Sequence, residues 1–311
     1  MDTIYLASLD ENSGKTLLAA VLGQRLAAQG RRVSYVKSGS DASDRDAQAM
    51  QQALGAGRQD APETASRQDA VLLVEAPRGA FDARSVVQDL ARFQGARIVL
   101  VAWYREGLSA GEVADKAIDL KGSLAGVLLN GVPKLRLHHV QTTLAPQLRE
   151  AGIPVLGILP QDRVLRAATI REIAETVEGD IQLFPENADA LVEHVMIGGL
   201  VLDNGQYYFN QFKNKLVVTR WDRPDLQNAA IETDTAGFLL TGGQGPIPYM
   251  QQRIQGKKIP VIVVQEGTVA LASRLDKAFS RGALHPRKIA RAAELLGSAP
   301  RLEDVMGAAA P

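Results

Sequence analysis

Short, wholly apolar segments alternate with segments of helical periodicity along this chain, and this alternation limits the folds open to it. Strands that are apolar throughout are buried on both faces, as in parallel sheets that helices cover on each side. The first part of the chain is therefore predicted to be an α/β domain with a doubly wound parallel sheet. Its strands are expected at residues 3–8, 32–37, 70–75, 97–102, 126–130 and 154–160.

The second part of the 311-residue chain repeats this rhythm. Two domains fit a length of this size, at roughly 100–200 residues each. We therefore expect a second, smaller α/β domain, separated from the first by a modest break near residues 179–185. The expected boundaries are residues 1–180, residues 186–297 and a C-terminal tail at residues 298–311.

Composition excludes several kinds of function. Lys and Arg number 35 and so do Asp and Glu, so the chain lacks the basic excess that nucleic-acid binding proteins need. It contains no cysteine, which excludes disulfides, iron–sulfur clusters and Cys-ligated zinc. No apolar run approaches the roughly 18 residues of a membrane helix. We expect a cytoplasmic protein with neither a nucleic-acid nor a membrane partner.

The segment SLDENSGKT, residues 8–16, joins the first expected strand to a helix expected over residues 16–29. Backbone N–H groups at such a helix start face anions, and in a Gly-Lys-Thr sequence the lysine reaches phosphates and the hydroxyl ligates Mg²⁺. The strict motif has glycine where this chain has Leu9. The alternative is a glycine turn with a surface lysine. The predicted nucleotide-binding residues are Asn12, Ser13, Gly14, Lys15, Thr16 and Leu17.

This loop resembles that of dethiobiotin synthetases, which carry an acidic residue at the place of Asp10 and also lack the first glycine. The segment YVKSGS at residues 35–40 is similar to their lysine-bearing loop. The resemblance implies that Lys37 meets the terminal phosphate or a substrate carbamate. It further implies that Mg²⁺ is held by Thr16, Asp46 and Glu75.

The order of elements supports that set independently. The carboxyl ends of neighbouring parallel strands meet at one edge of a sheet, and Lys15, Lys37 and Glu75 all follow such ends. Two cations and two carboxylates are a reasonable set of charges around a triphosphate and Mg²⁺. Asp46 and Lys37 also have plainer interpretations, the first as a helix cap and the second as a solvated strand end.

A second resemblance covers residues 2–297. The stretch at residues 152–175 closely resembles the N-terminal, P-loop-like domain of long phosphotransacetylases. Asp222-Arg223 and Thr241-Gly242-Gly243 match the pattern that names the DRTGG domain, which follows the P-loop-like domain in those proteins. A related segment accompanies CBS domains in nucleotide-regulated pyrophosphatases. This chain therefore resembles the N-terminal regulatory half of long phosphotransacetylases, without the acetyltransferase domain.

The DRTGG segment suggests a second ligand site. Glycines after a strand can direct N–H groups toward an anion. The candidate residues are Arg220, Arg223, Thr241, Gly242 and Gly243. The alternative is structural: Asp222 caps the next helix and pairs with Arg223, and Pro224 occupies its first turn. Trp221 stands where glycine is common, which places any ligand there in doubt.

Three functions compete. The first is a regulatory or sensor protein that binds Mg²⁺ and ATP, or another nucleotide, with a protein partner or as a homo-oligomer. The second is an ATP-dependent ligase or synthase of the dethiobiotin synthetase or cobyrinate amidation type, which phosphorylates a carboxylate or carbamate. In that case Lys15 and Lys37 are catalytic and stabilise the transferred phosphoryl group. The third is an interaction protein with a vestigial loop. The sequence leaves open whether ATP is turned over.

Overall fold

The structure is a computed structural model that describes residues 2–38, 45–54, 70–77, 83–120, 122–199, 205–279, 283–299 and 305–306. The chain forms two units, one of residues 1–162 with 284–311 and the other of residues 163–283. Each unit has its own sheet of five or six strands. Within the described ranges, no helix is long and apolar enough to cross a membrane.

The first unit is built on a six-stranded sheet with the order β2-β3-β1-β4-β5-β6. Every neighbouring pair is parallel, which confirms the predicted sheet. The strands are β1 (Asp2–Ser8), β2 (Arg32–Lys37), β3 (Ala70–Glu75), β4 (Arg97–Trp103), β5 (Leu124–Val132) and β6 (Val155–Pro160). All nine residues of β5 are buried, because β5 lies inside the sheet with helices on both faces.

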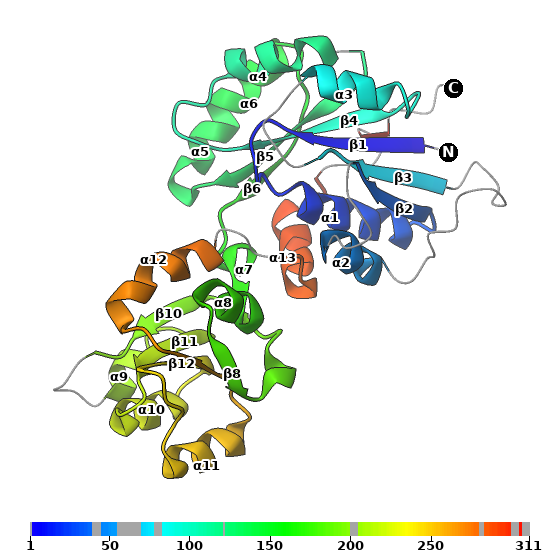
Figure 1. Ribbon diagram of the computed structural model, residues 1–311. Helices are drawn as coiled ribbons and strands as arrows, with labels where there is room; N and C mark the ends of the chain where they lie inside the picture. The colour runs from blue at the N-terminus through cyan, green and yellow to red at the C-terminus, as the bar shows by residue number, and fades with distance from the viewer. Residues whose placement is uncertain are drawn as a thin grey trace. The chain divides into compact units, whose positions relative to one another are not determined.

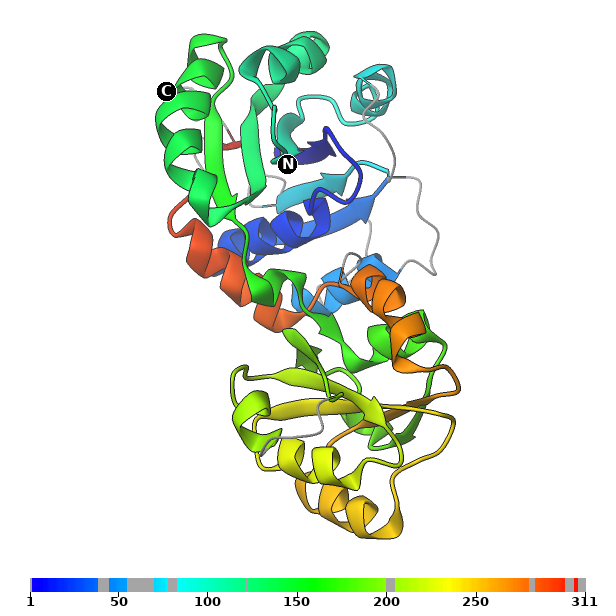
Figure 2. The same cartoon turned by 90° about the vertical axis from the view of Figure 1, so that its left-hand side faces the viewer.

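Helices cover both faces of this sheet (Figures 1 and 2). One side carries α1 (Lys15–Ala28), α2 (Arg45–Ala53) and α13 (Pro286–Leu296). The other side carries α3 (Ala83–Leu90), α4 (Ala110–Ala117), a 3₁₀ turn at Ile118–Leu120, and α6 (Ala145–Glu150). The helical segment at residues 134–150 is composite: it consists of a 3₁₀ turn at Lys134–Arg136, α5 (Leu137–His139), a π-helical turn at Val140–Leu144 and α6.

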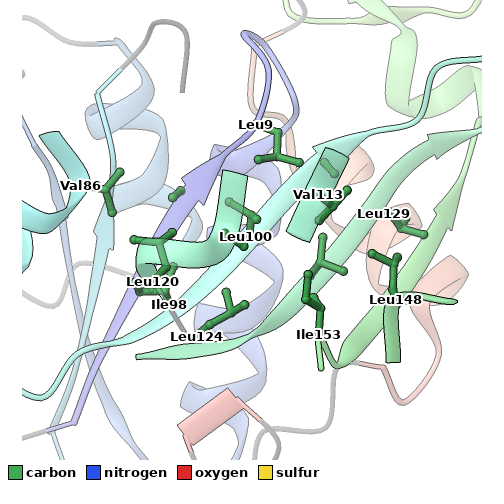
Figure 3. Close-up of a cluster of buried hydrophobic side chains, with 14 of the residues drawn as sticks. Leu9, Val86, Ile98, Leu100, Val113, Leu120, Leu124, Leu129, Leu148 and Ile153 are labelled. Atoms are coloured by element: carbon green, nitrogen blue, oxygen red, sulfur yellow. The ribbon is translucent and has the colours of Figure 1, made fainter. Parts of the chain in front are cut away.

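A cluster of buried side chains fills the space between the sheet and the α3/α4/α6 layer (Figure 3). Ile98, Leu100 and Leu129 project from the strands, and Val86, Val113 and Leu148 from the helices. Leu9, from the loop that follows β1, belongs to the same cluster and is 4% exposed. The loop of residues 9–14 between β1 and α1, called the phosphate loop below, thus begins with a residue of the core.

The second unit has a five-stranded sheet with the order β10-β11-β12-β13-β8. Its strands β10 (His194–Ile197), β11 (Lys215–Arg220), β12 (Thr235–Thr241) and β13 (Val261–Val264) are parallel, and β8 (Asp180–Leu183) runs antiparallel at one edge. A two-stranded ribbon joins β7 (Ala168–Thr169) to β9 (Leu191–Val192). This sheet, smaller than that of the first unit, confirms the predicted second α/β region.

Apolar helix faces cover both sides of this second sheet. On one side lie α8 (Ile170–Val177) and α12 (Thr268–Ala278), and on the other lie α9 (Gly205–Phe209), α10 (Pro224–Ile231) and α11 (Pro248–Lys257). Two short elements complete the unit: α7 (Arg163–Arg166) and a 3₁₀ turn at Pro185–Asn187. A capping box, in which Thr169 and Glu172 exchange hydrogen bonds, fixes the start of α8.

The two units differ from the expected boundaries in two ways. The expected break near residues 179–185 is the edge strand β8, and α8 before it packs into the core of the second unit through Ile170, Ile173 and Val177. The helix at Pro286–Leu296 belongs to the first unit, where it packs on α1. Its position is fixed in part by Arg25, whose guanidinium donates to the carbonyls of Gly297 and Ala299, each at 2.6 Å.

Lys215, at the start of β11, is fully buried. Its ammonium donates to Thr233 Oγ1 at 2.9 Å and to the carbonyl of Asp234 at 2.7 Å. Burial lowers the pKa of Lys215 from 10.5 to about 8. The folded protein therefore releases this proton at a lower pH than the unfolded chain does.

We predict that Lys215→Met changes how stability depends on pH. Between about pH 8 and pH 10.5 the unfolded wild-type chain holds one more proton at Lys215 than the folded protein, so wild-type stability rises with pH. The Lys215→Met variant lacks this contribution. Urea unfolding of both proteins across this range should show wild type gaining up to about 1.4 kcal/mol per pH unit relative to the variant. Parallel curves would contradict the burial of an ammonium at this position.

Candidate functional site

The phosphate loop connects β1 to α1 in the first unit. Lys15, the first residue of α1, is 6% exposed, and its ammonium donates to Ser8 Oγ at 2.8 Å. Gly14 occupies the N-cap position in a left-handed conformation, with φ at 90°. A residue with a Cβ is strained at this φ, so glycine lets the chain turn directly into the helix. The loop therefore holds a cation beside the N–H groups of a helix start.

The absence of the usual first glycine has a structural reason. Leu9 continues the sheet by donating its N–H to the carbonyl of Val101 in β4 at 3.0 Å, while its side chain enters the core. The chain leaves the sheet only after this residue, where Asn12 and Gly14 both have positive φ angles. An apolar residue at position 9 thus anchors the loop.

Two polar atoms of the loop are buried without a hydrogen-bond partner among the described residues: Asp10 Oδ2 and Ser13 Oγ. Ser13 is fully buried. Unpaired buried polar atoms are rare in folded proteins and are normally satisfied by water or a ligand. The loop therefore has unused hydrogen-bonding capacity.

Glu75 lies at the end of β3, the strand beside β1. Its carboxylate accepts hydrogen bonds from Thr16 Oγ1 at 2.9 Å and from the Tyr35 hydroxyl at 2.6 Å. Burial raises the pKa of Glu75, and the two hydrogen bonds and the charges of Lys37 and Lys15 oppose this rise. Tyr35 was not predicted as a site residue, although it lies two residues before Lys37 on β2.

Lys37 ends β2 and is 6% exposed. The next residue, Ser38, donates its N–H to the carbonyl of Glu75 at 2.8 Å and its hydroxyl to Asp89 Oδ2 at 2.6 Å. Asp89 also accepts from the buried Tyr5 hydroxyl at 2.8 Å. These contacts hold the end of β2 to β3 and to α3. The structure thus places Lys15, Lys37 and Glu75 at one edge of the sheet.

The oxygen donors of this edge fit a magnesium ion. Mg²⁺ prefers hard oxygen ligands and commonly binds through one or two carboxylates together with substrate phosphates. The Thr16 hydroxyl and the Glu75 carboxylate, which are hydrogen-bonded to each other, supply two such oxygen ligands. The Asp46 side chain lies outside the described residues, so its predicted role stays a prediction. Among the described side chains, no group of three or more His, Cys, Asp or Glu residues could hold a metal.

Asn130 also contributes to the loop and was missed by the sequence analysis. It lies near the end of β5, is 6% exposed, and donates its side-chain N–H to the carbonyl of Ser13 at 2.7 Å. Its amide lies so close to Gly14 that a Cβ on residue 14 would overlap Nδ2. The available signal was a polar residue near the carboxyl end of an otherwise apolar strand.

The DRTGG segment has a different arrangement from the one expected. Arg220 makes two hydrogen bonds to Asp222, at 2.8 and 2.7 Å, and Arg223 makes two to Asp225, at 2.9 and 2.7 Å. Arg223 is the N-cap residue of α10, and no side chain caps this helix. The expected Asp222 cap is wrong, because Arg223 and not Asp222 occupies the N-cap position. The Asp222 carboxylate makes its bidentate pair with Arg220, and the nearby charge of Arg223 also lowers the pKa of Asp222. The expected place of Pro224 in the first turn is confirmed.

Side chains also cover the Thr241-Gly242-Gly243 turn. Gly242 and Gly243 both have positive φ angles, and a Cβ would meet Trp221 at the first and Gln265 at the second. The fully buried Gln227 holds the preceding loop by donating to the carbonyls of Arg220 and Trp221, at 3.2 and 3.0 Å. Binding of an anion at this turn stays a prediction.

Comparison with known proteins identifies both halves of the chain. Residues 4–174 match the family model of the CobQ/CobB/MinD/ParA nucleotide binding domain, and residues 172–278 match the DRTGG domain. The chain therefore belongs to the CobQ/CobB/MinD/ParA family, with a DRTGG domain following the nucleotide-binding domain.

A relative with a curated name is a phosphate acetyltransferase of Synechocystis sp. (strain ATCC 27184 / PCC 6803 / Kazusa). It is 25% identical over 172 residues, which cover 52% of this chain and 24% of that protein. The chain thus spans about a quarter of the length of that relative. This match agrees with the resemblance to the N-terminal part of long phosphotransacetylases.

Two solved structures are similar to parts of the chain. One holds the CBS and DRTGG domains of the regulatory region of Clostridium perfringens pyrophosphatase complexed with its activator diadenosine tetraphosphate (TM-score 0.32, 16% identity, 38% of this chain and 51% of that one). The other is chloroplast FtsY from Physcomitrella patens (TM-score 0.33, 16% identity, 50% of this chain and 57% of that one).

We predict that Glu75→Gln alters the pH dependence of stability. Because burial raises the folded pKa of Glu75 above 4.5, the folded protein retains a proton that the unfolded chain releases as the pH rises. Wild-type stability should therefore fall relative to the variant from about pH 4.5 upward, by at most about 1.4 kcal/mol per pH unit. Urea unfolding of both proteins at several pH values measures this. A constant difference between them would show that Glu75 titrates normally.

Proposed function

We propose that the first unit of this chain binds ATP with Mg²⁺. The observation that carries the proposal is the edge of the sheet where Lys15 lies at the helix start and Thr16 contacts Glu75. Lys15 would contact the phosphates, Lys37 the terminal phosphate, and Thr16 and Glu75 would hold Mg²⁺ with the nucleotide. Asn12, Ser13, Gly14 and Leu17 complete the proposed loop, and Asp46 the proposed metal ligands.

We further propose that the chain is a regulatory or sensor protein. In this proposal nucleotide occupancy of the first unit is reported to a partner or a second copy of the chain, and the DRTGG domain takes part in that response. The match to a quarter of a phosphate acetyltransferase supports a role as a regulatory part of such an enzyme. A sensor of this kind needs saturable binding and little turnover.

The buried position of Lys37 favours one alternative. Lys37 is a second lysine near the proposed phosphate site, and the hydrogen bonds of the next residue, Ser38, to Glu75 and Asp89 hold this strand end in place. A lysine in this position would stabilise a phosphoryl group during its transfer as well as a bound phosphate. An ATP-dependent ligase that phosphorylates a carboxylate or carbamate would use it in this way. Phosphate release that depends on an added small acid or amine would support the ligase.

We predict that Lys15→Ala weakens binding of Mg-ATP about tenfold or more. The substitution removes a charge-assisted contact worth roughly 1.5–3 kcal/mol. Calorimetric titration of Mg-ATP into wild type and variant measures the difference. Lys116→Ala is the matched control, because Lys116 lies in the last turn of α4 and pairs with Glu112 on the surface.

Four outcomes of this titration are informative. Saturable heat that stops at saturation supports a sensor, and continuing heat supports turnover. Equal affinities in wild type and the Lys15→Ala variant would place nucleotide binding elsewhere. No heat from wild type at several temperatures would leave the loop a structural relic.

A further inference from the structure

The peptide bond between Ser13 and Gly14 lies at the most constrained point of the phosphate loop. Asn12 and Gly14 on either side have φ angles of 53° and 90°, both in the left-handed region. Ser13 between them is fully buried, and its hydroxyl has no partner among the described residues. The loop therefore needs an outside contact to keep this peptide in one orientation.

Asn130 supplies that contact. Its side-chain amide donates to the carbonyl of Ser13 at 2.7 Å, across 117 positions of sequence. A carbonyl can only accept, so the contacting atom is the amide nitrogen and the orientation of the side chain is fixed. In a trans peptide the C=O and N–H point to opposite sides. Asn130 thus directs the Gly14 N–H away from itself, at the start of α1.

The backbone of Asn130 is itself firmly held. Its carbonyl accepts from the N–H of Tyr104 at 2.7 Å, and in the ladder it lies opposite Trp103 of β4. The following residue, Gly131, has φ at 73°, and a Cβ there would overlap the Trp103 ring. A rigid strand end therefore presents the amide to the loop.

We propose that Asn130 is a positioning residue that locks the Ser13–Gly14 peptide with its N–H available to phosphate. The proposal rests on the proposed binding of ATP. If this peptide reversed, the Ser13 carbonyl would take the place of the Gly14 N–H at the helix start. An acceptor would then replace a donor where an anion binds, and the phosphate contact would become repulsive.

Two substitutions at Asn130 test the lock. Asn130→Ala removes the donor and should weaken binding of Mg-ATP by roughly three- to tenfold. Asn130→Asp keeps the volume but places a carboxylate against the Ser13 carbonyl, so it should weaken binding more than the alanine does. A role in packing alone would give the opposite order. Asn187→Ala is the matched control, because Asn187 makes the same amide-to-carbonyl contact, to Lys258 at 2.8 Å, within the second unit.

The second arm of the experiment replaces the nucleotide with magnesium tripolyphosphate. A residue that acts through the peptide bond must weaken tripolyphosphate and Mg-ATP by the same factor. Loss of affinity for Mg-ATP alone would overturn the proposal, since Asn130 would then act on the nucleoside. Unchanged affinity for both would also overturn it. If the alanine variant does not fold, the isosteric aspartate variant carries the test.

Failure of this inference is distinguishable from failure of the proposed function. Wild-type protein that binds neither Mg-ATP nor tripolyphosphate refutes nucleotide binding itself. Wild-type protein that binds both, with Asn130 variants that bind as well, refutes only the lock. Urea unfolding of each variant without ligand reports any loss of stability separately from the change in affinity.

Discussion

At one edge of its sheet the first unit buries three ionisable side chains, and their charges and hydrogen bonds offset part of the cost of burial. Lys15, Lys37 and Glu75 are each at most 6% exposed. A buried charge is costly unless it is paired and hydrogen-bonded. Here the carboxylate is stabilised by two hydroxyls and two ammonium groups, and Lys15 has the Ser8 hydroxyl as well. When all three are ionised, the two ammonium groups leave one positive charge unbalanced by Glu75, which favours the entry of an anionic triphosphate.

Burial on both faces of the sheet explains which strands could be predicted from the sequence. Strands buried on both faces must be apolar throughout, so β1, β4 and β5 are evident as short apolar runs. The edge strand β8 is not, because in DIQL polar residues alternate with apolar ones and only half of the strand is covered. The helix α4 was not predicted either, because its sequence AGEVADKA buries only Val113 and Ala117 and so has little apolar periodicity.

Some residues of the candidate site could be predicted from the sequence and others could not. Motif residues that follow strand ends could be predicted, because topology alone brings Lys15, Lys37 and Glu75 to one edge. Side-chain contacts for which the sequence offers several neighbouring partners could not be predicted. Arg220 and Arg223 have two aspartates nearby in the sequence, and the structure pairs Arg220 with Asp222 and Arg223 with Asp225.

Leu9 shows how a departure from a motif can be compensated by the fold. Glycine at this position would free the start of the loop, whereas leucine commits it to the core of the α3/α4/α6 layer. All conformational adjustment then falls on residues 10–14, where the positive φ angles of Asn12 and Gly14 lie. The hydrogen bond from Asn130 of β5 to the Ser13 carbonyl holds this part of the loop. The loop is thus held at its beginning by the Leu9 side chain in the core and near its end by the Asn130 hydrogen bond.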